Sequence, residues 1–87
     1  MASYEVLWKT SAEKELRDTD RKQVPRIVRA VEGLSDDPFP TGYRKLRGSE
    51  RSYRIRVSDY RVVYQVDSKA NQVVIYHVRH RQDAYRR

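Results

Sequence analysis

The sequence feature that most restricts the fold is a pair of alternating segments near the middle of the chain. Residues 53–57 read Tyr-Arg-Ile-Arg-Val, residues 60–66 read Tyr-Arg-Val-Val-Tyr-Gln-Val, and only Ser58 and Asp59 separate them. β-Branched and aromatic residues are enriched in strands, and two such segments joined by two turn residues are typical of a β-hairpin. The chain is therefore expected to contain an antiparallel strand pair with one apolar and one polar face.

The register of this hairpin follows from its two-residue turn. Val57 is expected opposite Tyr60, and Arg56 opposite Arg61. Successive side chains of a strand point to opposite faces of the sheet. The apolar and aromatic residues of both segments therefore share one face, which we predict to be the core: Tyr53, Ile55, Val57, Tyr60, Val62 and Tyr64. The arginines of both segments project from the other face: Arg54, Arg56 and Arg61.

The remaining elements are predicted from periodicity and from helix start and stop signals. Residues 4–8 are expected to form a first strand, and a helix over residues 10–17 is expected to begin with Thr10 as N-cap and Glu13 three positions later. A second helix is predicted from apolar residues at helical spacing, which are Val24, Ile27, Val28, Val31 and Leu34. Residues 33–42, which contain two prolines, are expected to terminate this helix and form a loop. Residues 45–48 are expected to be a short strand or extended segment, residues 73–78 the last strand and residues 79–87 a basic tail.

This order predicts a fold of the α+β class. Two N-terminal helices are expected to pack on one face of a twisted, mainly antiparallel four-stranded sheet. The 87 residues are enough for one domain, which we expect to span residues 1–87. The chain has no cysteine, and it has no apolar run near the ~20 residues that cross a bilayer. Residues 1–5 lack the pattern of a signal peptide, so we expect a cytoplasmic protein without a membrane partner.

The last strand is expected to extend the arginine face. If Val66 and Gln72 are partners across the second turn, Arg61 lies opposite His77, and Arg79 and Arg81 share its face. The same register places three aliphatic residues on this open face: Val63, Val73 and Ile75. Either the C-terminal tail covers them, or they form a groove for a segment of a partner, since exposed apolar patches mark interaction sites.

The charge of the chain supports an anionic partner for this face. Residues 1–43 contain 7 Lys/Arg and 8 Asp/Glu, whereas residues 44–87 contain 12 Lys/Arg and 4 Asp/Glu, so the net charge of +7 comes from the second half. Like charges opposite each other on neighbouring strands are destabilising. The arrangement fits a site for a polyanion such as nucleic acid, and the alternatives are a solvated edge with separated arginines or a surface for an acidic protein.

The residue types present favour RNA over DNA as a substrate. The sequence contains no Ser-His-Asp set, no paired carboxylates, no glycine-rich phosphate loop and no cluster of metal ligands. Phosphodiester cleavage would then depend on acid–base groups and cationic stabilisation, with no cofactor. RNA permits this route because its 2′-hydroxyl is an internal nucleophile. Tyr85, in the basic tail, suits base stacking or proton transfer.

Four motifs in this order resemble the RelE/ParE toxin superfamily. They are Lys45-Leu46-Arg47-Gly48, Tyr53-Arg54-Ile55-Arg56-Val57, Asp59-Tyr60-Arg61-Val62-Val63-Tyr64 and His80-Arg81-Gln82-Asp83-Ala84-Tyr85. The resemblance covers nearly the whole chain and implies a RelE-like microbial RNase fold. It implies the toxin of a type II toxin–antitoxin system, whose RelE branch cleaves mRNA in the ribosomal A site through the 2′-hydroxyl without metal.

The resemblance also implies roles for individual residues. Arg61 and Arg81 match arginines that hold phosphate, with Arg81 placed to assist the leaving group, and Tyr85 matches a tyrosine that stacks on a base. Arg54 and Arg56 stand where well-known members have lysines and complete the expected catalytic set. The expected substrate-binding residues are Lys45, Arg47, His77, Arg79 and His80, with Arg79 replacing a glycine often found before the His-Arg pair.

The general base is left open by this pattern. Arginine, with an ordinary pKa of about 12.5–13.8, almost never accepts a proton. His80, Tyr85, a group of the ribosomal RNA or charge stabilisation alone are the alternatives for this step.

The expected partners follow from the same resemblance. They are mRNA, the ribosome and a RelB-like antitoxin in a toxin–antitoxin hetero-oligomer. An acidic, amphipathic antitoxin segment is expected to pack near Val63 and Ile75 and on the helices. The alternative functions are a ParE-like toxin that poisons DNA gyrase without nuclease activity, and a basic RNA-binding module without catalysis.

Overall fold

The predicted hairpin forms the centre of the sheet. The computed structural model describes residues 3–48 and 50–81. In it, β3 (Ser52–Val57) and β4 (Tyr60–Asp67) pair antiparallel. Val57 lies opposite Tyr60, and Arg56 lies opposite Arg61, which confirms the predicted register.

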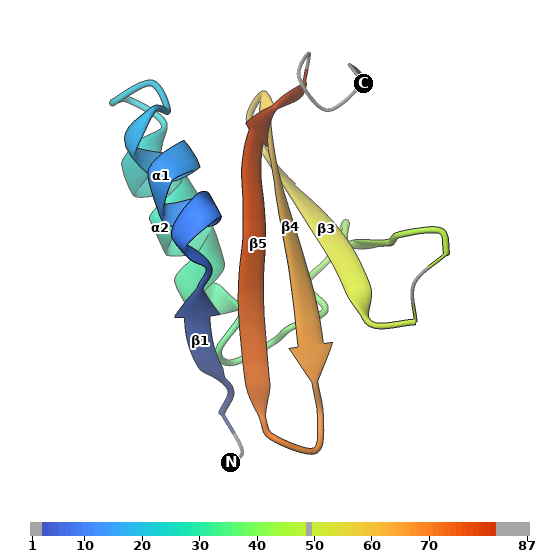
Figure 1. Ribbon diagram of the computed structural model, residues 1–87. Coiled ribbons are helices and arrows are strands. Elements are labelled where there is room, and N and C mark those ends of the chain that lie inside the picture. The colour runs from blue at the N-terminus through green and yellow to red at the C-terminus, as the bar shows by residue number, and fades with distance from the viewer. Residues whose placement is uncertain (1–2, 49, 82–87) are drawn as a thin grey trace.

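Three further strands complete the sheet, and Figure 1 shows β1, β5, β4 and β3 side by side. β1 (Glu5–Trp8) and β5 (Gln72–His80) run parallel, whereas β2 (Arg44–Lys45) is antiparallel to β3. The strand order is β1-β5-β4-β3-β2. The sheet therefore has five strands and not the predicted four, because Arg44 and Lys45 pair with β3 even though their strand is only two residues long.

Two helices supply the other side of the core. α1 spans Thr10–Arg17 and α2 spans Val24–Gly33, close to the predicted bounds. Lys9, and not Thr10, is the N-cap of α1, and no side chain caps this end, so the predicted capping box is wrong. No helix within residues 3–48 and 50–81 is long and apolar enough to cross a membrane.

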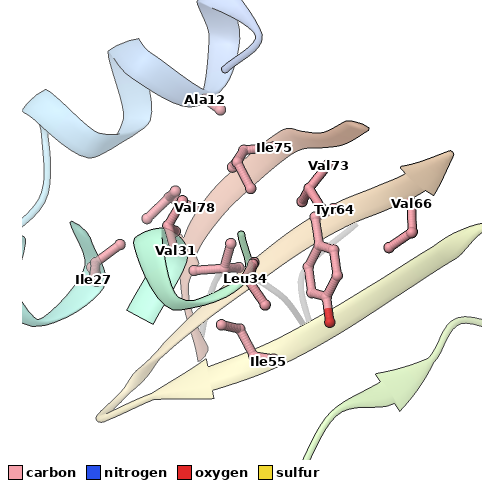
Figure 2. Packing of buried hydrophobic residues seen from close by; sticks show 11 residues of the cluster. Ala12, Ile27, Val31, Leu34, Ile55, Tyr64, Val66, Val73, Ile75 and Val78 are labelled. Atoms are coloured by element: carbon pink, nitrogen blue, oxygen red, sulfur yellow. The ribbon is translucent and has the colours of Figure 1, made fainter. Parts of the chain in front are cut away.

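The core lies between these helices and alternate residues of the three long strands (Figure 2). Ile27, Val31 and Leu34 come from α2 and the residue after it. They share one buried cluster with Ala12 of α1 and with strand residues: Ile55, Val62, Tyr64, Val66, Val73, Ile75 and Val78. The hydrophobic stabilisation of the fold comes from this single cluster, so its members tolerate truncation poorly.

Tyr64 ties the long loop after α2 to the centre of the core. Its side chain is fully buried, and its hydroxyl donates a hydrogen bond to the carbonyl oxygen of Pro38 at 2.7 Å. Burial raises the pKa of the Tyr64 hydroxyl above its ordinary value, because the phenolate would lose its hydration. The loop leads from Pro38 to β2 and brings β2 to the edge of β3.

The register between β4 and β5 differs from the predicted one in two places. Asp67, and not Val66, is the partner of Gln72, because the Asp67 carboxylate accepts the backbone N–H groups of Lys69 and Ala70 at 3.0 Å and closes a tighter turn. A β-bulge follows, since Tyr64 pairs with Ile75 but Val63 pairs with His77. Tyr76 is the additional residue of β5.

These two shifts overturn part of the predicted open face. Val73 and Ile75 are fully buried in the core, so they do not belong to an exposed groove. Beyond the bulge the alternation is restored, and His77 and Arg79 lie on the arginine face as predicted. The cross-strand partner of Arg61 is Arg79, however, and not His77.

Candidate active site

Basic side chains occupy two neighbouring rows across the face of the sheet opposite the core. The first row, at the end next to the β3–β4 turn, consists of Arg56, Arg61 and Arg79 on β3, β4 and β5. The second row runs across β2 to β5 and consists of Arg44, Arg54 and His77, with the apolar Val63 between Arg54 and His77. We call these two rows the cation face. Neighbouring strands lie about 4.8 Å apart, and residues two apart on a strand lie about 6.8 Å apart, so these groups can act on one ligand.

Two adjoining hollows lie on the cation face. The larger, of about 260 Å³, is lined by arginines of β2, β3 and β4: Arg44, Arg54, Arg56 and Arg61. The smaller, of about 150 Å³, is lined by Leu46, Val63, His77 and Arg79 together with Arg54 and Arg61. Arg54 and Arg61 border both hollows, so a ligand in either one lies beside both residues. Planar guanidinium groups bind phosphate oxygens through two parallel hydrogen bonds.

One carboxylate organises the β5 side of the cation face. Glu15 of α1 accepts a hydrogen bond from the Arg79 Nε at 3.1 Å and lies 3.3 Å from the His77 Nδ1. It also accepts the backbone N–H of Val78 at 3.0 Å. β1 pairs with β5 only up to Ile75, so Glu15 covers the strand edge that β1 leaves open. The same side chain thus protects an edge strand and orients two residues of the site.

Arg56 and Arg81 lie at the hairpin end of the sheet. The Arg56 Nε donates to the carbonyl oxygen of Ser58 at 3.2 Å, which ties this exposed side chain to the turn. The backbone N–H of Arg81 donates to the carbonyl oxygen of Asp59 at 2.6 Å. The chain after β5 is therefore attached to the same turn, and Arg81 begins beside the first row of the cation face.

The structure does not bring every predicted site residue to this face. Lys45 pairs with Tyr53, so it lies on the core side of the sheet, and Arg47 is exposed beyond β2 and lines neither hollow. His80 pairs with Tyr60, and the two rings meet edge to face at 5.2 Å on the core side. Tyr85 lies outside the described residues.

Two residues of the site were not predicted from the sequence. Arg44 lies directly opposite Arg54. The face on which it lies could have been predicted only from alternation along β2, and a strand of two residues is too short to show alternation. Glu15 approaches from α1, and its distance of 62 positions from His77 leaves no local pattern to detect.

The comparisons with known proteins cover nearly all of this chain. A family model described as the ParE toxin of type II toxin–antitoxin systems, parDE, matches residues 6–85. The toxin RelG of Mycobacterium tuberculosis is 35% identical and covers 97% of this chain and 98% of its own. The chain belongs to the RelE/ParE toxin superfamily.

Solved structures of this superfamily share the fold. RelE in the archaeal RelE–RelB complex of Pyrococcus horikoshii superposes with a TM-score of 0.80 at 27% identity, over 91% of this chain and 96% of that chain. The isolated RelE toxin of Escherichia coli gives a TM-score of 0.79 at 26% identity, over 90% and 84% of the two chains. The RelE/ParE superfamily fold thus accounts for the arrangement that carries the cation face.

Pyrophosphate is expected to stabilise this toxin through the cation face. The rows place Arg56 opposite Arg61 and Arg61 opposite Arg79, and an anion between them removes the repulsion between these like charges. At ten times its dissociation constant, a ligand raises the free energy of unfolding by about 1.4 kcal/mol, which corresponds to several degrees in Tm. Thermal unfolding with increasing pyrophosphate measures this shift.

Sodium chloride at matched ionic strength is the control for simple screening of the arginines. The double variant Arg54→Ala/Arg61→Ala should lose the shift that exceeds this control, because both side chains border both hollows. An equal shift in the double variant would place the anion elsewhere on the protein.

Proposed function

We propose that this toxin is an endoribonuclease that cleaves mRNA in the ribosomal A site through attack by the 2′-hydroxyl, and thereby stops translation. The observation that carries the proposal is the pair of hollows bordered by Arg54 and Arg61. Attack on a phosphodiester places additional negative charge on the phosphate oxygens, and guanidinium groups fixed around them stabilise that charge. The proposed active unit is a single cytoplasmic domain over residues 1–87.

The shape of the site supports a role for the ribosome. The hollows are partly open to solvent and lined in large part by arginines, so the cation face offers phosphate contacts but few groups that could read a base. An RNA strand held only by such contacts keeps many orientations, whereas in-line attack needs one. A codon already held in the A site has much of this freedom removed. In this proposal Arg81 assists the leaving group and Tyr85 stacks on a base of the codon.

Primer extension on a defined mRNA in a reconstituted translation reaction tests the proposal. Cuts are expected at the A-site codon, and Arg81→Ala is expected to remove them because it takes away the cation to which the proposal assigns the leaving group. Arg29→Ala is the matched control, since Arg29 is exposed on α2 and carries the same charge. Intact mRNA under active translation would refute the nuclease function.

Poisoning of DNA gyrase is the second candidate, because the family model that matches residues 6–85 is described as a ParE toxin. This function needs a binding surface and no cleavage chemistry. Induction of the toxin would then cause gyrase–DNA breaks to accumulate while mRNA stays intact, and the breaks would persist in Arg81→Ala.

We further propose that an antitoxin of the RelB type neutralises this toxin in a hetero-oligomer. The solved relatives include RelE–RelB complexes. An acidic, amphipathic segment of the antitoxin fits the cation face, where Val63 supplies an apolar contact between basic residues of neighbouring strands. Ile75 takes no part in this contact, because it is fully buried.

Val63→Asp is expected to weaken antitoxin binding by at least about tenfold. The substitution removes an apolar contact and sets a carboxylate against an acidic segment, and one such charged contact is commonly worth more than ~1.4 kcal/mol. Titration calorimetry with the cognate antitoxin measures the change. Ala70→Asp adds the same charge at the exposed β4–β5 turn and serves as control. Equal affinities for Val63→Asp and the unmodified toxin would move the antitoxin off the cation face.

A further inference from the structure

The proposed cleavage needs a group that accepts the proton of the 2′-hydroxyl. The arginines of the cation face are unsuited to this step, because guanidinium groups keep their protons at any physiological pH. Histidine is the side chain whose ordinary pKa suits proton transfer near neutral pH. The chain has two histidines, His77 and His80, three positions apart on β5.

The β-bulge directs these histidines to different surroundings. His80 pairs with Tyr60 and packs against its ring on the core side of the sheet. His77 pairs with Val63 in the second row of the cation face and lines the smaller hollow beside Arg54 and Arg61. Its side chain is 35% exposed, so a ligand in the hollow can reach the imidazole.

Glu15 determines which ring nitrogen of His77 is left for a ligand. The Glu15 carboxylate accepts hydrogen bonds from the Val78 N–H at 3.0 Å and from the Arg79 Nε at 3.1 Å. An ionised carboxylate only accepts hydrogen bonds, so the Nδ1 of His77, 3.3 Å away, must carry the proton. The neutral imidazole then has its lone pair on Nε2, which has no hydrogen-bond partner within the described part of the chain.

We infer that His77 is the general base of the cleavage reaction and that Glu15 is its positioning residue. This inference rests on the proposed nuclease function. A purely structural role of Glu15 requires only the bond that covers the β5 edge, the one to Val78. The carboxylate instead gathers two further side chains, His77 and Arg79, both of which line the hollow.

The reaction balances with these groups alone and water. The proton of the 2′-hydroxyl passes to the Nε2 of His77 while the 2′-oxygen forms a bond to phosphorus. The bond from phosphorus to the 5′-oxygen breaks, and that oxygen takes a proton from water. The resulting hydroxide accepts the proton from the imidazolium, so His77 returns to its neutral form. The products are a 2′,3′-cyclic phosphate and a 5′-hydroxyl, and no water is consumed.

Single-turnover cleavage of mRNA on stalled ribosomes, measured from pH 5 to pH 8, tests the inference. His77→Ala is expected to reduce the rate at neutral pH by about 100- to 10,000-fold, the usual contribution of a general base. The rate of the unmodified toxin should rise with pH across the range in which histidine side chains titrate, whereas the rate of His77→Ala should not. Added imidazole should restore part of the lost rate.

The charged groups around His77 are known, so the pH profile can be interpreted. Glu15 faces it from α1, Arg54 from β3, Arg61 from β4 and Arg79 from β5. Glu15→Gln is expected to lower the rate by about 10- to 100-fold, because the carboxylate both fixes the tautomer and stabilises the imidazolium. Glu13→Gln, an exposed change on the same helix, should leave the rate unaltered.

A second readout separates orientation from folding. Nitrogen NMR of the His77 ring should show the Nδ1–H tautomer in the unmodified toxin and lose this preference in Glu15→Gln, with Tm values of both proteins above the assay temperature. An unmodified rate in His77→Ala, or a slow rate with an unchanged pH profile and no response to imidazole, would overturn the inference while leaving the nuclease function intact. No cleavage by the unmodified toxin would refute the nuclease function and the inference together.

Discussion

Arg61→Ala and Arg54→Ala are each expected to lower the single-turnover rate of mRNA cleavage by about 100- to 1,000-fold. This is the usual effect of removing one fixed donor that stabilises developing charge. Both residues border both hollows of the cation face, so a scissile phosphate bound in either hollow lies beside them. Arg61→Lys should retain an intermediate rate, because lysine keeps the charge but lacks the planar pair of donors. Rates are measured on ribosomes stalled at one codon.

Thermal unfolding is the control for loss of the fold in both alanine variants. Arg61 lies opposite Arg56 on one side and Arg79 on the other, and neither Arg61 nor Arg54 belongs to the buried cluster of the core. Both variants should therefore remain folded at the assay temperature. Loss of activity with a much lower Tm would indicate unfolding and would contradict the assigned role, as would full activity in either alanine variant.

Ile75→Ala is expected to destabilise the fold far more than any substitution on the cation face. Ile75 is fully buried in the only large cluster of the described residues, and truncation of such a side chain costs about 2–5 kcal/mol. Domains of this size have a total stability near the lower end of about 5–15 kcal/mol, so the variant should be close to unfolding. Urea denaturation, with the midpoint and the slope both fitted, measures the loss.

Val74→Ala is the matched control on the neighbouring position. Val74 is half-buried on the opposite side of β5, and its truncation should cost less than about 1.5 kcal/mol. Comparable losses at positions 74 and 75 would show that the register between β4 and β5 is not the one described.

The sequence was sufficient to predict the central hairpin because the signals there are local. A two-residue turn and strict alternation determine both the register and the face of each residue, and Arg54, Arg56 and Arg61 lie where these rules place them. The placement of His77 and Arg79 on the same face was also correct. The predicted register between β4 and β5, however, was wrong by one residue at the turn. The additional residue at Tyr76 shifts the pairing by one residue more, so His77 and Arg79 still lie on the predicted face.

The features that were missed depend on contacts between distant segments. The turn at Asp67 is tightened by a carboxylate, and a bulge carries no motif of its own, so the burial of Val73 and Ile75 could not be read from alternation. Glu13 and Glu15 both lie in α1, and nothing in the neighbouring sequence distinguishes one glutamate from the other. Only the packing of α1 against β5 shows that Glu15 reaches the site and Glu13 does not.

The bulge at Tyr76 also gives β5 one point at which its length can change. Val73, Ile75, His77 and Arg79 all stand at odd positions, yet the first two belong to the core and the last two to the cation face, because the additional residue lies between them. Loss of Tyr76 would leave Ile75 opposite Tyr64 and His77 opposite Val63, so both faces would survive in a regular strand. Loss of a residue elsewhere in the strand would turn core residues outward. Descendants of this chain with a shorter β5 are therefore expected to have lost the residue at the bulge.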